Sequence, residues 1–134
     1  TLDFLGIVTD NWPRLLEERN RSNPAAHRSA LIRLVAARLK RNPPGGPVIA
    51  AGSTGSIPAT AELLAVIAGL PNGAVVLPGL DSELDDASFA AITAPGARPA
   101  TLGHPQYGLA KLIGGMRVQR RDVEAIGAAA PHLA

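Results

Sequence analysis

The pattern of apolar and polar residues divides the chain into a helical first part, a strand–helix–strand centre and a helical last part. Near the start, apolar residues recur at helical spacing up to Trp12, and Pro13 marks a break or a fresh start. A second helical pattern runs from about Pro24 to Arg41, with Asn23 as its N-cap. These two segments predict a helical hairpin within residues 1–46.

The helix predicted over residues 24–41 is amphipathic. When its positions are projected at about 100° per residue, four apolar side chains share one face: Leu31, Ile32, Val35 and Leu39. Arg33, Lys40 and Arg41 lie broadly opposite them, so the helix is expected to have a basic back. Between Arg14 and Arg41 the chain has eight basic residues and two acidic ones, which makes this its electropositive part.

Residues 47–81 have the pattern of a strand, a loop of small residues, a helix and a second strand. The strands are predicted at 48–50 and 75–77, and the helix at 58–70 with Ser56 as its N-cap. Two strands joined by one helix should lie parallel. The predicted fold class is therefore α/β, with a small parallel sheet flanked by helices.

Residues 82–134 form the helical last part of the prediction. A short helix is expected to begin at Ser82, a further one to run from near Pro105 to Gly114-Gly115, and a last short one to span 120–126. The acidic residues around Asp81 lack the spacing of a calcium loop, and the three histidines are far apart. The chain has no cysteine, and we expect neither a metal nor a cofactor in these residues.

The loop after the first predicted strand has the place of a nucleotide site without its chemistry. In P-loop ATPases the end of such a strand carries an acidic pair that holds magnesium and activates water. Here those positions are Ala51 and Gly52, so no catalytic residue is expected. A loop before a helix N-terminus can bind phosphate, but this one lacks the Gly-Lys-Ser/Thr ending of a P-loop. Its residues are weak candidates for an anion site: Ser53, Thr54, Gly55 and Ser56.

Three segments of the chain resemble the alphaproteobacterial AddB family, the second subunit of the AddAB helicase-nuclease. They are GPVIAAGSTGSIPATAELLAVIAGLP, GAVVLPGLDSELDD and HPQYGLAKLI, and the resemblance extends from about Leu2 to Val123. It implies an internal fragment of a longer subunit, forming a single helicase-like domain fragment within a RecA-like, superfamily 1 helicase-like fold. The chain begins at Thr1 and its only methionine is Met116, which also leads us to expect a fragment.

The resemblance implies a role in double-strand break repair by recombination. The parent would be an ATP-dependent hydrolase whose nuclease lies outside this chain. By analogy with RecC, the present module would be non-catalytic and would line the path of single-stranded DNA beside an AddA-type partner. The candidate DNA contacts are Arg33, Lys40, Arg41, Tyr107, Arg117, Arg120 and Arg121.

Two alternatives stay open at this point. The basic helix could dock on the AddA-type partner as a protein scaffold without touching DNA, or the GSTGS loop could serve a small phosphate-binding enzyme. No apolar run approaches the roughly 20 residues of a membrane helix. The opening residues do not resemble a signal peptide. A cytoplasmic location is therefore expected.

Overall fold

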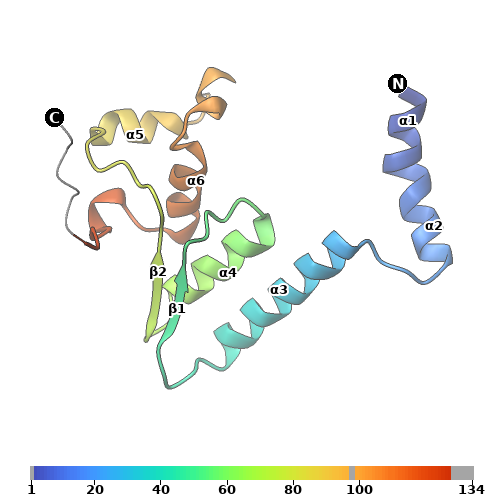
Figure 1. Ribbon diagram of the computed structural model, residues 1–134, viewed down its shortest axis with the longest axis horizontal. Helices are drawn as coiled ribbons and strands as arrows, with labels where there is room; N and C mark the ends of the chain where they lie inside the picture. The colour runs from blue at the N-terminus through green and yellow to red at the C-terminus, as the bar shows by residue number, and fades with distance from the viewer. Residues whose placement is uncertain (1, 97–98, 128–134) are drawn as a thin grey trace.

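A helical arm stands apart from a mixed α/β body in the computed structural model, which describes residues 2–96 and 99–127 (Figure 1). The arm is one continuous helix built from α1 (Leu2–Gly6), the π-helical turn η1 (Ile7–Asn11) and α2 (Trp12–Glu18). Residues 19–23 connect the arm to α3, which leads into the body. The remaining elements follow in chain order: α3 (Pro24–Arg41), β1 (Val48–Ala51), α4 (Pro58–Ala68), β2 (Gly73–Val76), α5 (Asp86–Ile92), η2 (Pro99–Gly103), α6 (Tyr107–Met116) and η3 (Arg120–Asp122).

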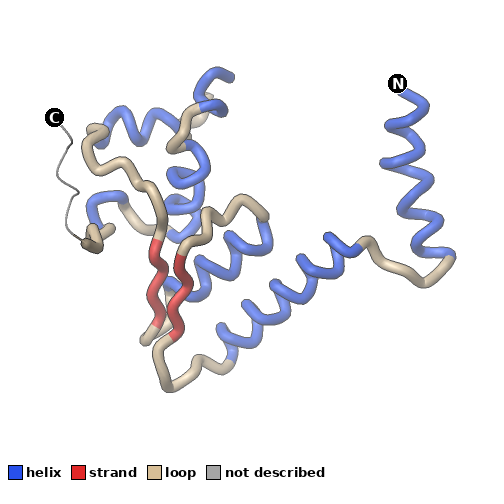
Figure 2. Tube along the Cα trace, in the orientation of Figure 1, coloured by secondary structure: helices blue, strands red, loops and turns tan. Residues whose placement is uncertain are grey.

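The predicted α/β class with a small parallel sheet is confirmed. The strands β1 and β2 pair in parallel, with Val48 opposite Gly73 and Ala51 opposite Val76. Figure 2 shows the two strands side by side and helices around them. Within the described ranges the sheet has these two strands alone, so both are edge strands. The finer assignment to a RecA-like domain stays a prediction.

Helix α3 has the predicted bounds, Pro24 to Arg41. The Oδ1 of Asn23 accepts a hydrogen bond from the backbone N–H of Ala25 at 2.9 Å, which satisfies one of the free donors at the helix start. Pro24, which has no N–H to satisfy, stands in the first turn. Local side-chain chemistry therefore determines where this helix begins.

The predicted apolar face of α3 is partly wrong. The side that packs on α4 is formed by Ala36, which is buried, and by the half-buried Ile32 and Leu39. Leu31 and Val35 are exposed instead. The sequence projection identified the packed face by its large apolar side chains and so included Leu31 and Val35. The helices instead approach closely at Ala36, whose side chain is small.

Of the two roles predicted for Pro13, a break or a fresh start, the structure shows the fresh start: α2 begins at Trp12, and the helical path of the arm is not interrupted. The π-helical turn lies directly before α2, so that Pro13 falls in a first turn, where its missing N–H costs least. The hydroxyl of Thr9 donates to the carbonyl oxygen of Leu5 at 2.8 Å inside the helix. The predicted hairpin is open in the structure, since the arm lies away from α3 (Figure 1).

Helix α4 is the centre of the body. It packs on α3, on α6 and on both strands, and its buried residues are Ala59, Leu64 and Ile67. It covers one side of the sheet, because Val48, Ala50 and Val75 are partly buried. On the other side Ile49 is 65% exposed, together with the exposed Ala51 and Ala74. The sheet thus has an uncovered apolar face.

A second apolar cluster joins α5 to α6. Phe89 and Ile92 of α5 are buried against Ala110 and Ile113 of α6. Helix α5 begins at Asp86 rather than at the predicted Ser82, because the carboxylate of Asp81 accepts hydrogen bonds from the backbone N–H groups of Glu83 (2.9 Å) and Leu84 (3.1 Å) and holds a turn there.

Asp85 is the N-cap of α5, and it accepts a hydrogen bond from the backbone N–H of Ser88 at 2.8 Å. The side chain and the N–H of Ser88 lower the pKa of the Asp85 carboxyl by stabilising its ionised form. The last predicted helix is shorter than expected, since η3 spans Arg120–Asp122 and does not continue to Ile126.

Replacing Gly73 by alanine should destabilise the body by about 1–3 kcal/mol, the typical cost of overpacking. A Cβ on Gly73 would overlap the backbone carbonyl oxygen of Ile67 and lie 2.9 Å from the Cβ of Leu70. Gly46→Ala is the matched control, because a Cβ there meets nothing within 4 Å. Urea unfolding followed by circular dichroism should give a lower midpoint for Gly73→Ala alone; equal midpoints would contradict the prediction.

Candidate functional site

The carboxyl end of β1 is where a nucleotide hydrolase of this layout would hold its acidic pair. Ala51 is exposed there, on the uncovered side of the sheet. The backbone N–H of Gly52 donates to the carbonyl oxygen of Val76 at 3.1 Å, and Gly52 has a φ of 76°. A positive φ is uncommon for residues other than glycine, so this backbone disfavours a glutamate at the position. The strand end therefore lacks the acidic side chains of the hydrolase pattern, and its backbone favours glycine.

The loop that follows is held by its own atoms and by α6. The backbone N–H of Gly55 donates to the Oγ of Ser53 at 3.4 Å, and Gly55 has a φ of 62°. A Cβ on Gly55 would come within 2.7 Å of the side chain of Leu112. Thr54 and Ser56 are exposed. The glycine is thus favoured by its left-handed backbone and by the close approach of the loop to the Leu112 side chain, independently of any ligand.

Ser56 is not the N-cap of α4, contrary to the prediction. The cap residue is Ile57, with an extended backbone and no side-chain hydrogen bond to the helix. Pro58 follows in the first turn. Because isoleucine has no polar side-chain atom, the free N–H groups at the start of α4 have no side-chain acceptor from the cap residue.

Arg33 does not lie on an outward basic face. Its Nε is 3.0 Å from Oε2 of Glu62, so the pair bridges α3 and α4. Both side chains are 52% exposed, and a bridge with this exposure contributes at most about 1 kcal/mol. Arg33 is nevertheless engaged within the protein, and as a DNA contact it would first have to leave Glu62.

Lys40 and Arg117, 77 positions apart in sequence, line one pocket. The pocket has a volume of about 370 Å³ and lies where the carboxyl ends of α3, α4 and α6 meet. Its other lining residues are mainly apolar or small: Pro43, Ala65, Val66, Gly69, Leu70, Pro71, Gly115 and Met116. The fold thus joins two basic clusters that the sequence separates.

The two cations of this pocket have free charged groups. Among the described residues, neither the Lys40 ammonium nor the Arg117 guanidinium has a hydrogen-bond or ion-pair partner. The converging carboxyl helix ends give the pocket partial negative charge that favours both cations. Because two full positive charges exceed three partial negative ones, the site can still attract an anion.

Arg117 also ends α6. Its φ of 59° places it in the left-handed region, and its N–H bonds to the carbonyl oxygens of Ile113 and Gly114. Arg41, at the end of α3, is exposed, and its Nε lies 3.4 Å from the carbonyl oxygen of Ala37. These two arginines and Lys40 all lie at or next to the last turn of a helix, where cations are favoured.

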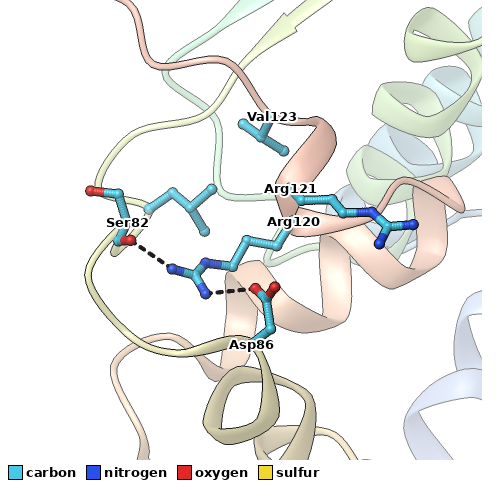
Figure 3. Close-up of a pocket in the computed structure, with 6 residues that line it drawn as sticks. Ser82, Asp86, Arg120, Arg121 and Val123 are labelled. Carbon is cyan, nitrogen blue, oxygen red and sulfur yellow. Dashed lines mark hydrogen bonds and ion pairs between the residues drawn. The ribbon is translucent and has the colours of Figure 1, made fainter.

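Arg120 is a structural residue with its guanidinium fully engaged (Figure 3). It donates to the carbonyl oxygens of Asp81 (3.2 Å) and Ser82 (2.8 Å), and its Nη1 is 3.0 Å from Oδ1 of Asp86. It also lies 5.2 Å from the ring centre of Phe89, and its side chain is 12% exposed. Arg120 therefore joins η3 to the turn before α5 and is poorly placed to reach a nucleic acid.

Arg121 and Tyr107 have different surroundings. Figure 3 shows the Arg121 side chain extending away from that of Arg120. Arg121 is exposed and lines a pocket of about 220 Å³. Tyr107 is partly buried against the cluster of α5 and α6. The candidate DNA contacts are thus not one surface: Lys40 and Arg117 are together, and Arg121 stands elsewhere.

Sequence reasoning missed one polar positioning residue, Gln106. Its Nε2 donates to the carbonyl oxygen of Gly79 at 3.0 Å, and its Oε1 accepts from the N–H of Asp81 at 3.1 Å. It thereby fastens the loop after β2 to the start of α6. The available signal was its position next to the α6 N-terminus, which by itself does not indicate a partner 25 residues away.

Comparison with family models, with curated proteins and with solved structures finds no match for this chain. In the described part of the chain, no helix is long and apolar enough to cross a membrane. No three His, Asp or Glu side chains come together there as a metal site would require.

Arg120→Ala should lower the free energy of unfolding by roughly 2 kcal/mol, since hydrogen bonds to charged groups are worth about 1.5–3 kcal/mol and the carbonyls would lose their donor. The neighbouring Arg121→Ala, which removes the same charge from an exposed side chain, should change it by less than about 0.5 kcal/mol. Thermal or urea unfolding of the two variants measures the difference. Equal losses would show that Arg120 acts only through general charge.

Proposed function

We propose that the chain is a non-catalytic, helicase-like module of an AddB-type subunit that supports DNA double-strand break processing. The observation that carries this proposal is the end of β1, where Ala51 and the left-handed Gly52 replace an acidic pair within a parallel strand–helix–strand unit. Such a unit retains the layout of a nucleotide-hydrolysing domain without groups that hold magnesium or activate water. The family resemblance supplies the biological setting of the proposal.

Within this proposal, Lys40 and Arg117 contact the phosphates of single-stranded DNA. They are unpaired among the described residues and line one pocket, while Arg33 and Arg120 are bound to acidic partners within the protein. None of the described residues that line the pocket is aromatic, so they offer no platform for base stacking. Contact through phosphates alone would be independent of base sequence and sensitive to salt.

A protein scaffold is the second candidate function, and one observation favours it. Large apolar side chains are exposed along the arm and α3, among them Phe4, Trp12 and Leu34. Exposed apolar patches of this kind mark surfaces that meet other proteins. An AddA-type subunit is the proposed partner in this reading.

Removing the two pocket cations should weaken binding to a labelled single-stranded oligonucleotide. Fluorescence anisotropy titrations of Lys40→Ala/Arg117→Ala at several salt concentrations should give a log–log salt slope smaller by about 2 than that of the unmodified chain. Arg14→Ala/Arg21→Ala, which removes the same net charge from the other end of the basic region, is the matched control. The proposed DNA path is wrong if both double variants lose affinity equally, or if the unmodified chain does not bind at low salt.

The chain should not bind Mg-ATP, because neither the strand end nor the loop offers a carboxylate for the metal or a lysine for the phosphates. Isothermal titration with Mg-ATP measures this directly. Binding that disappears in Ser53→Ala/Thr54→Ala would instead support a phosphate-binding enzyme and refute the non-catalytic assignment.

A further inference from the structure

The arm and α3 each carry an apolar stripe that no other described element covers. On the arm the stripe contains Phe4, Val8 and Trp12, spaced four residues apart on the same side of a helix. On α3 it contains Leu31 and Leu34, with Val35 beside them and Arg38 one turn further. Trp12 is 49% exposed and Leu34 is 64% exposed. Both stripes therefore leave apolar area in water.

The residues of the two stripes lie at matching distances along the chain from the connection at 19–23. Trp12 lies seven positions before Arg19, and Leu31 lies eight positions after Asn23. Val8 and Leu34 are each eleven positions from the same two ends. Apart from the π-helical turn η1, the two helices rise equally per residue, so residues equidistant from the connection come nearly level in an antiparallel pair. A connection of five residues is long enough for such a helical hairpin.

Charge also favours the pairing. The arm, residues 2–18, has four acidic residues and one basic residue, whereas α3 has five basic residues and no acidic one. Phe4 and Arg38 are each fifteen positions from the connection, so the arginine stem and guanidinium would lie level with an aromatic ring. Antiparallel helices place opposite dipole ends beside each other. The outer face of α3 and the arm thus match in the spacing of their apolar residues and have opposite charge.

We propose that the arm folds back about residues 19–23 and covers the outer face of α3 of the same chain as an antiparallel hairpin. The open arrangement of Figure 1 and this closed one then form a two-state element. A protein partner that binds the outer face of α3 must displace the arm. The closure is independent of the DNA contact, because Lys40 lies beside α4 and not on the outer face.

Engineered cysteines test the register, and the chain has no cysteine of its own to interfere. Under mild oxidation, Val8→Cys/Leu34→Cys should form a disulfide within one chain. In Val8→Cys/His27→Cys the second cysteine lies seven residues nearer the connection, about 10 Å along α3, so that pair should not form one. Equal yields in the two pairs would overturn the proposed register. A disulfide found only between chains would show that a second copy covers the face and would overturn closure within one chain.

The emission of Trp12, the only tryptophan, gives an independent readout on the full chain. Closure predicts blue-shifted emission that acrylamide quenches weakly, at every protein concentration. Leu34→Asp should shift the emission to the red and increase quenching, whereas Ala26→Asp, which is exposed and lies opposite Val35 on the helix, should change neither. Leu34 is exposed in the open structure, so its substitution leaves the body intact, as circular dichroism would verify. Emission of a fully exposed indole in the unmodified chain would overturn the proposal, whatever the outcome with DNA.

Discussion

Burial of α4 is the constraint on which the body of this protein depends. The helix has apolar residues on several sides and packs at once on α3, α6 and the sheet. Its neighbours must therefore come close. Gly55 lies against Leu112 of α6, and Gly73 lies against the backbone at the end of α4. Without these small residues the loop and the second strand would be pushed away, and the two strands would lose their common support.

Local signals in the sequence predict the elements of this fold well. Asn23 and Pro24 determine the start of α3, and the apolar runs around Val48 and Val75 predict both strands and their parallel pairing. In each case the interactions that form the element lie within the segment itself or across one connection. For the helix start such information is present in a few consecutive residues, and for the two strands it lies within one strand–helix–strand unit.

The sequence does not predict the side-chain contacts between segments that are far apart in the chain. The pairing of Arg33 with Glu62, and the clamp that Arg120 makes on the turn before α5, join residues 29 to 39 positions apart. In the sequence, Arg33 and Arg120 are basic residues like Lys40 and Arg117. Only the three-dimensional structure shows which of the four are paired with acidic side chains. The packed face of α3 was missed for a related reason, since Ala36 contributes by being small enough for α4 to approach.

The two edge strands have a consequence for how the protein behaves at high concentration. Each of β1 and β2 leaves one row of backbone N–H and C=O groups unpaired by the other strand, and neither strand contains a proline or a charged residue. Proteins normally protect such rows with exactly those residues or with a covering element, because an open row is a template for a strand from another molecule. With the uncovered face of Ile49 beside them, the rows are where strand pairing between molecules would begin, and their length of four residues limits it.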